Sequence, residues 1–338
     1  MMGNFRKAKQ EKSSIKKMKE QKQREKILNN SLMCLPKSTQ KSLGIISIQC
    51  EDEVFYLGND VYLKAYSLNF KTLTPDSRKV LIEKLCNASF CRMRLSSFVK
   101  NSSNKPGKVL RFLTVYVKEC GYAAAYDEYK RIDDILNVIS EETEVSITPC
   151  SISNVLTIMH MNFLGEIKNY DINAFIKQRE DMKKVIFPNI EEEFNKFQIE
   201  SSLYGACYTG IEFSEDFAGV YEYFENVKYN IQSCIDIQAM TREEAEMFHY
   251  NLKRRYNYAF GNSEADRNVN LTFLLSVVNV SPEERERMCK ELHREKSMML
   301  MPCTGKQQTV FSSICSLGLI DYHIMRNQKE ELIGKLFL

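Results

Sequence analysis

Two kinds of apolar spacing alternate along the chain after residue 35. Val61, Leu63 and Ala65 alternate with polar or tyrosine neighbours, a period of two that predicts a half-buried β-strand. Residues 122–139 instead place apolar and tyrosine side chains three and four positions apart, which is typical of an amphipathic helix. The alternation of these two periods predicts a mixed fold of the α+β or α/β class.

The first part of the folded region predicts a strand followed by six elements in the order β-α-β-β-α-β. Thr74-Pro75-Asp76 carries a helix start, because a threonine hydroxyl can cap the helix and proline fits its first position. We expect a basic polar loop from Lys100 to Lys108. The remaining strands are expected at 55–57, 61–66, 90–95, 109–117 and 145–148, and a second helix at 122–139. The order β-α-β-β-α-β is that of a ferredoxin-like plait.

The same order is expected to recur in the second part of the chain. Strands are predicted at 204–213, 231–239 and 269–277, and helices at 217–224, after Thr241 and after Ser281. Thr241–Glu244 and Ser281–Glu284 both have the pattern of a capping box, and Ala245, Phe248, Leu252 and Tyr256 would form the buried stripe of the helix after Thr241. The fold prediction is therefore two ferredoxin-like, plait-like units linked by helices.

The predicted domain boundaries follow from these patterns. A basic arm and linker cover residues 1–34, the first α/β unit 35–150, a helical connection broken near Pro188 covers 151–198, and the second unit 199–338. The arm has few apolar residues and no helical stripe, so we expect it to be mobile by itself and to become helical on a surface.

The charge of the chain is concentrated in this arm. Residues 1–26 hold ten of the 47 basic and three of the 44 acidic residues, so the arm carries +7 and the rest of the chain −4. Such an arm can bind nucleic acid, anionic lipid or an acidic partner, or can be a solvated tail. The candidate contact residues are Arg6, Lys7, Lys9, Lys12, Lys16, Lys17, Lys19, Lys22, Arg24 and Lys26.

The remaining composition argues for an intracellular protein. The eleven cysteines are scattered between Cys34 and Cys315 without the paired spacing of a zinc site, so we expect reduced thiols in a reducing compartment. No run approaches the roughly 18 apolar residues that a membrane span needs. We expect a protein of the cytoplasm, which stays on the side of the membrane where it is made.

Catalytic and cofactor motifs are not recognisable, so we expect neither an enzyme nor a bound cofactor. The histidines, namely His160, His249, His293 and His323, have no ligand spacing. Thr304-Gly305-Lys306 is not a phosphate-binding loop, because Leu300 replaces the required glycine and Gln307 the required serine or threonine. The acidic runs at 141–142 and 191–193 are expected to form solvated faces of helices. A metal-dependent enzyme built from distant acids stays open as an alternative.

Several short segments resemble the N-terminal region of the CagE/TrbE/VirB family of type IV secretion and conjugation ATPases, in the version of Gram-positive mobile elements. They are the linker at 35–43 (LPKSTQKSL), the hairpin at 53–66 (EVFYLGNDVYLKAY), the Asp127-Glu128-Tyr129 tripeptide, the strand and capped helix from Val269, and Gln307-Gln308 with Gly318. This sequence departs from the pattern at Ser316-Leu317, where the family has Leu-Pro, and holds no Walker A or Walker B segment up to Leu338.

What the resemblance implies is the role of that N-terminal region rather than ATP hydrolysis. The expected function is a non-catalytic assembly component of a conjugative DNA-transfer apparatus, docking to the motor ATPase, to membrane channel subunits and to copies of itself. The resemblance also implies that the protein lies peripherally at the inner face of a bacterial membrane. The alternative is a nucleic-acid-binding protein that acts through the basic arm, with anionic lipid as a further partner left open.

Overall fold

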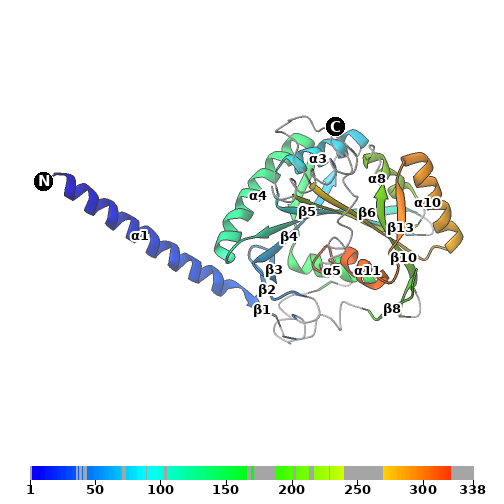
Figure 1. The fold of residues 1–338 in the computed structure, drawn as a ribbon, viewed down its shortest axis with the longest axis horizontal. Coiled ribbons are helices and arrows are strands. Elements are labelled where there is room, and N and C mark those ends of the chain that lie inside the picture. The colour runs from blue at the N-terminus through cyan, green and yellow to red at the C-terminus, as the bar shows by residue number, and fades with distance from the viewer. Residues whose placement is uncertain are drawn as a thin grey trace, which may run out of the picture.

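The computed structural model shows a mixed α+β protein built on one large antiparallel sheet of 13 strands (Figure 1). It describes residues 2–35, 37, 40, 44–70, 74–88, 90–102, 105–165, 169–170, 188–200, 203–212, 217–227, 229–239 and 269–320. Seven helices lie in this part of the chain, and six of them cover the two faces of the sheet. The expected mixture of strands and helices is confirmed.

The first part of the chain supplies eight strands and four helices. They are α1 (Met2–Ser31), β1 (Met33–Cys34), β2 (Ser47–Gln49), β3 (Val54–Gly58), β4 (Val61–Phe70), α3 (Pro75–Asn87), β5 (Arg92–Ser102), β6 (Lys105–Lys118), α4 (Tyr122–Thr143), β7 (Val145–Pro149), α5 (Ile152–Leu164) and β8 (Ile190–Glu192). The predicted cap of α3 is present, because the Thr74 hydroxyl accepts a hydrogen bond from the Ser77 N–H.

The second part supplies the remaining elements. They are β9 (Phe197–Ile199), β10 (Leu203–Glu212), α8 (Phe217–Asn226), β11 (Asn230–Ala239), β12 (Val269–Val278), α10 (Pro282–Lys296), β13 (Met299–Pro302) and α11 (Gln307–Cys315). The capping box of α10 is confirmed: Ser281 and Glu284 exchange hydrogen bonds between side chain and backbone. The helix predicted after Thr241, with Ala245, Phe248, Leu252 and Tyr256, lies outside the described residues.

The strand order repeats across the sheet. The first part has the order β7-β4-β6-β5, the second has β13-β10-β12-β11, and all these pairs are antiparallel. The two orders meet where β5 pairs with β11, from Ile231 opposite Val99 to Gln238 opposite Arg92. We call this β5–β11 pairing the seam, because it joins the two parts into one continuous sheet.

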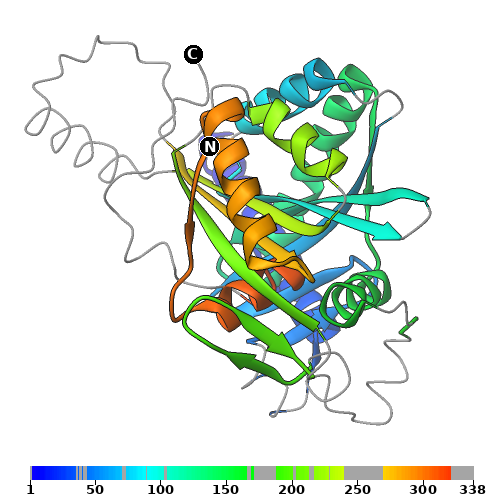
Figure 2. The same cartoon turned by 90° about the vertical axis from the view of Figure 1, so that its right-hand side faces the viewer.

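Helices form a layer on each face of the sheet. On one face α3, α4, α8 and α10 bury residues such as Leu85, Tyr129, Phe224 and Leu292 against the strands. On the other face α5 and α11 lie side by side, with the Phe163 and Phe311 rings in edge contact at 5.7 Å (Figures 1 and 2). Both faces of the central strands are therefore buried.

Equivalent residues recur at constant separations in the two parts. The same number of residues separates Ile48 from Ile190, Phe55 from Phe197 and Tyr66 from Tyr208. It also separates the start of α3 at Pro75 from the start of α8 at Phe217. A second constant number of residues separates Glu144 from Ser297, both of which end a helix in the left-handed conformation. It also separates Pro149-Cys150 from Pro302-Cys303 and Gly165 from Gly318, both glycines having a positive φ. The strand order and these residues thus correspond, and we call residues 47–165 the first repeat and residues 190–318 the second repeat.

Three predictions of secondary structure need correction. Most of the loop expected from Lys100 to Lys108 belongs to the paired ends of β5 and β6, since backbone hydrogen bonds between antiparallel strands form without an apolar sequence pattern. The helical connection holds α5 but also the strands β8 and β9, so the acids Glu191 and Glu192 lie on a strand. The arm is a helix, α1, without any bound surface.

Candidate functional site

Helix α1 carries all ten candidate contact residues and extends away from the body of the protein (Figure 1). Its sequence consists mostly of Lys, Glu, Gln, Arg and Met, which have high helix propensity, and Lys16 and Glu20 pair across one turn at 3.8 Å. The side chains of α1 are described from Lys16 onward, so Arg6, Lys7, Lys9 and Lys12 are placed by their backbone alone. The basic helix is the structural form of the predicted arm.

The end of α1 near the sheet is anchored on α4. Arg24 Nη2 lies 2.5 Å from Asp127 Oδ1, and its guanidinium lies over the Tyr126 ring at 5.7 Å. Leu28 packs, partly buried, against the core of the sheet face that α4 covers. Arg24 is therefore a positioning residue of the helix rather than a free contact charge.

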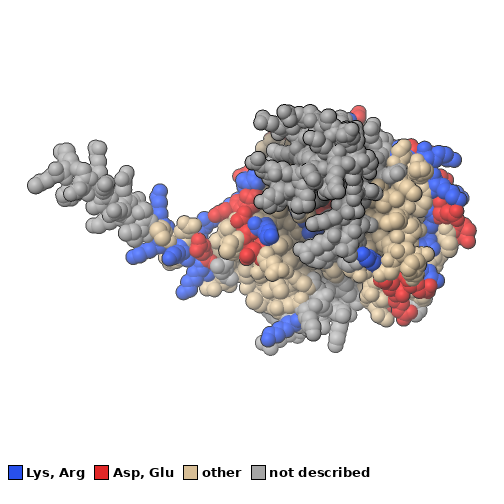
Figure 3. Space-filling view, in the orientation of Figure 1, with Lys and Arg blue, Asp and Glu red and all other residues tan. Residues whose placement is uncertain are grey.

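The opposite side of α1 is exposed and basic. Met18, Lys22 and Lys26 follow one another at intervals of four residues, so they share a helical face. Lys19, Lys22 and Lys26 point away from the side that carries Arg24 and Leu28, and Met18 borders these lysines. None of these lysines forms an ion pair with another described residue, and Figure 3 shows blue side chains along the helix. We call Met18, Lys19, Lys22 and Lys26 the outer face of α1.

A row of tyrosines connects the base of α1 to the sheet. The rings of Tyr56 and Tyr62 stack at 4.8 Å, Tyr62 and Tyr122 lie 5.9 Å apart, and Tyr122 and Tyr126 lie 6.3 Å apart. The Tyr122 hydroxyl donates a hydrogen bond of 2.8 Å to Asp52, and burial raises the pKa of Tyr62 to about 12. The row is a neutral, packed support that fixes the direction in which α1 leaves the body.

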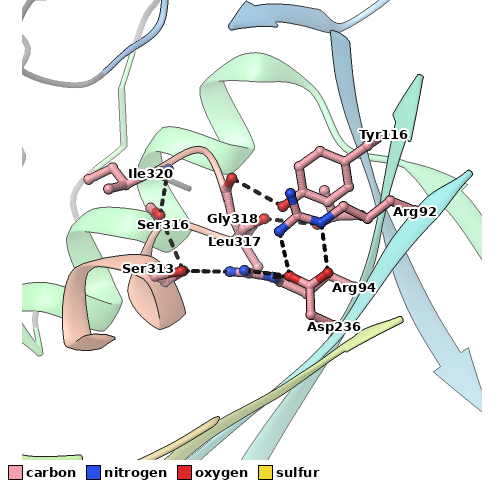
Figure 4. Close-up of polar contacts among 10 residues, drawn as sticks. Arg92, Arg94, Tyr116, Asp236, Ser313, Ser316, Leu317, Gly318 and Ile320 are labelled. Carbon is pink, nitrogen blue, oxygen red and sulfur yellow. Dashed lines mark hydrogen bonds and ion pairs between the residues drawn. The ribbon is translucent and has the colours of Figure 1, made fainter. Parts of the chain in front are cut away.

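A buried polar cluster lies at the seam (Figure 4). Asp236 on β11 accepts hydrogen bonds from Arg94 at 2.6 Å and 2.9 Å and from Arg92 at 2.8 Å, all three residues being connected across the strand pair. Burial alone would raise the pKa of Asp236, but the two guanidinium groups outweigh burial and hold that pKa below its usual range. The lowered pKa favours the charged form of this aspartate, which pairs with two arginines.

The same cluster binds the carbonyl groups at the end of α11. Arg94 donates to the Ser313 carbonyl at 2.8 Å, Thr114 to that of Leu317 at 3.1 Å, and Tyr116 to that of Gly318 at 3.1 Å (Figure 4). Carbonyl groups at a helix C-terminus lack partners within the helix and attract positive charge. The two arginines and one aspartate of the seam leave one positive charge uncompensated, and this charge stabilises the C-terminal end of α11. The cluster therefore has a structural role.

The seam cluster was not predicted from the sequence. Arg92 and Arg94 alternate with Met93 and Leu95, a pattern that predicts a solvent-exposed polar face. The α5–α11 layer covers that face instead, and Arg94 is 2% exposed. The signal that could have indicated the cluster is the presence of arginines in β5 and of an aspartate in β11, two otherwise apolar strands.

Among the residues that the structure describes, the other predicted polar groups are not brought together into a reactive site. His160 is buried on α5 beside the Tyr170 ring, His293 is exposed in the last turn of α10, and His249 and His323 lie outside the described residues. Thr304–Lys306 forms a turn before α11. Within the described residues, no three His, Cys, Asp or Glu side chains gather as metal ligands.

The acidic runs and the thiols have structural surroundings. Glu192 accepts a hydrogen bond of 2.8 Å from the Gln308 N–H in the first turn of α11. Glu191, Glu192 and Glu193 are all exposed, as expected of a solvated acidic run. The cysteines are free, and burial raises the pKa of Cys150 and Cys303 to about 12, which keeps these thiols protonated and poorly reactive.

In the described part of the chain, no helix is both long and apolar enough to cross a bilayer.

Comparisons with known proteins assign no family. No protein-family model and no curated protein matches the sequence. Among solved structures, the chain is similar to GilR, an oxidoreductase that catalyses the terminal step of gilvocarcin biosynthesis, with 11% sequence identity and a TM-score of 0.33. The match covers 69% of this chain and 40% of GilR, and likeness at this level supports no statement about fold or activity.

Proposed function

We propose that this protein is a non-catalytic assembly component of a conjugative, type IV secretion-like DNA-transfer apparatus. In this proposal it docks to the motor ATPase and to membrane channel subunits at the inner face of a bacterial membrane. The observation that carries the proposal is α1, a 30-residue basic helix held at one end and exposed along its outer face.

The physical argument starts from what stabilises an exposed helix. A helix that is polar on all sides gains little from packing against its own protein, so its length is not needed for the fold. The described contacts of α1 with the body involve its last two turns, around Arg24 and Leu28. The remaining helix is positioned by α4 and the tyrosine row for contact with another molecule.

The rest of the molecule suits a rigid support. We infer that each repeat is a ferredoxin-like, plait-like unit and that the two arose by duplication, in agreement with the repeated strand order. The Arg92–Arg94–Asp236 cluster joins both repeats to α11 and leaves its polar groups facing one another. Such a cluster supports assembly rather than substrate turnover, which agrees with the resemblance to the non-motor region of the conjugation ATPases.

A pull-down experiment tests the role of the outer face. The variant Lys19→Glu, Lys22→Glu, Lys26→Glu is expected to recover at least about tenfold less motor or channel subunit from cells that carry the transfer genes, since like charges oppose docking. The matched control is Lys79→Glu, Lys108→Glu, Lys118→Glu, which changes the net charge equally at exposed lysines of the body. Equal recovery with both variants, or recovery of no transfer protein by the wild type, contradicts the proposal.

Nucleic-acid binding is the second candidate, favoured by the lysines that line one face of α1. Charge-driven binding weakens steeply with salt, with a slope of about −0.9 per phosphate neutralised on duplex DNA. The variant Lys19→Glu, Lys22→Glu, Lys26→Glu should therefore reduce the slope of the logarithm of the binding constant against the logarithm of the salt concentration by about 2 to 3. Fluorescence anisotropy with duplex DNA measures this slope. Binding of the wild type that does not depend on salt dismisses this candidate.

A further inference from the structure

The end of the sheet in the second repeat exposes large apolar side chains. Strand β13 and the β8–β9 hairpin follow one another along the same edge of β10, and the Gly305 N–H donates to the Phe194 carbonyl at 3.0 Å. Phe194 is 69% exposed, and Met299 and Met301 are each 42% exposed. The hydrogen bond from Gly305 places Phe194 next to the turn that follows β13, and in the described part of the sheet no strand pairs with the outer edge of β13.

The first repeat shows that the fold does not require apolar residues there. The interval from Ile48 to Phe55 equals that from Ile190 to Phe197, so Asp52 stands where the second repeat has Phe194. By the separation that relates Pro149 to Pro302, the counterparts of Met299 and Met301 are Ser146 and Thr148. All three counterparts are polar, so the apolar end of the second repeat requires an explanation other than packing.

Acidic side chains flank Phe194 on the β8–β9 hairpin. Glu191 and Glu193 are exposed on and just after β8, and the adjacent Lys196 pairs with Glu193 at 3.1 Å. Figure 3 shows red side chains gathered at the lower right of the molecule, where Figure 1 places β8. We call Glu191, Glu193, Phe194, Met299 and Met301 the acidic–apolar end.

The outer face of α1 has the complementary composition. Its lysines, Lys19, Lys22 and Lys26, would meet the glutamates, and Met18, which is 58% exposed, would meet the apolar side chains. Figure 1 shows α1 leaving the body on the side opposite β8, so the helix points away from the acidic–apolar end of its own chain. The complementary surfaces therefore belong at contacts between two molecules.

We propose that the outer face of α1 in one copy binds the acidic–apolar end of a second copy, so that copies associate head to tail. The inference rests on the proposed function as an assembly component and names one of its partners, a second copy of this chain. Because the two surfaces differ, the contact is heterologous and generates rings or open chains rather than a closed two-fold dimer.

A concentration series tests the apolar part of the contact. The wild-type mass measured by light scattering is expected to rise with concentration, and Met299→Ser, Met301→Thr to remain monomeric over a range at least about tenfold higher, since two exposed apolar anchors are lost. The substitutions install the residues of the first repeat, which that fold accommodates. The control Val138→Ser removes another exposed apolar side chain and should associate like the wild type. A wild type that is monomeric throughout, or that associates equally with all substitutions, overturns the proposal.

A charge exchange tests the pairing itself. One chain carries Lys19→Glu, Lys22→Glu, Lys26→Glu, and a second carries Glu191→Lys, Glu193→Lys; each is expected to be monomeric alone and the mixture to associate. Association through any other surface would not be restored by mixing. This outcome is separate from the proposed function, because Met299→Ser, Met301→Thr should lose self-association and still recover transfer proteins. If those proteins are not recovered by any variant while mixing restores association, the proposed function fails and the head-to-tail contact stands.

Discussion

Replacing Asp236 with alanine is expected to lower the free energy of unfolding by about 3 to 5 kcal/mol, because it leaves two arginines at the seam without their carboxylate. Arg94 is almost completely buried, so its charge cannot be solvated by water once the partner is removed. Urea unfolding followed by far-UV circular dichroism and tyrosine fluorescence measures the effect, since the chain has no tryptophan.

The control for this prediction is Asp127→Ala on α4. It removes the partner of Arg24, but both side chains are about half exposed, so a loss within about 1 kcal/mol is expected. The pH dependence gives a second readout. The pKa of Asp236 is lowered in the folded protein, so its contribution is present above the ordinary value of 3.8 and is lost as pH falls through the folded value. Equal losses for Asp236→Ala and Asp127→Ala would show that the seam pair contributes no more than a surface pair.

Gly318→Ala is expected to destabilise the protein by about 3 kcal/mol or more, through overpacking and a left-handed backbone conformation. A Cβ at this position would lie 1.9 Å from Tyr116 Oη and 3.1 Å from Arg94 Cζ, and its φ is +84°. The tyrosine would have to move, which breaks its hydrogen bond to the Gly318 carbonyl. Urea unfolding of the purified variant measures the loss.

The first repeat provides the matched control for Gly318. Gly165 occupies the equivalent position with a φ of +79°, but no atom lies within 4 Å of a Cβ built there. Gly165→Ala should therefore lower the free energy of unfolding by only about 1 kcal/mol, the cost of an alanine in the left-handed backbone conformation. A similar loss at both glycines would mean that contact with the seam cluster has no energetic weight.

Local patterns predicted the regular elements well, because capping groups and apolar periods act over a few residues. Helix α4, strand β6 and the capped start of α10 lie where their patterns placed them. Helix α1 was harder to predict, because its stability comes from high intrinsic propensity rather than from an apolar stripe. The strands β8 and β9 are too short to produce a recognisable period.

The long-range features could not be predicted because they depend on how the layers cover the sheet. The polar positions of β5 would face water in a two-layer plait, but the α5–α11 layer turns them into an interior cluster. Arg94 and its partner Asp236 are separated by 142 residues, so no local pattern relates them. The contrast between Ser146 and Met299 depends on the equivalent pairing of β7 with β4 and of β13 with β10, which no local pattern predicts.

The place of β5 at the seam affects how the chain can fold during synthesis. Strand β11 emerges from the ribosome more than a hundred residues after β5, so a nascent first repeat would display β5 as an unpaired edge with Arg94 lacking its counter-ion. Unpaired edges invite aggregation, and synthesis proceeds at only about 5 to 20 residues per second. A ribosome-associated chaperone that shields this edge for several seconds should raise the yield of correctly folded protein.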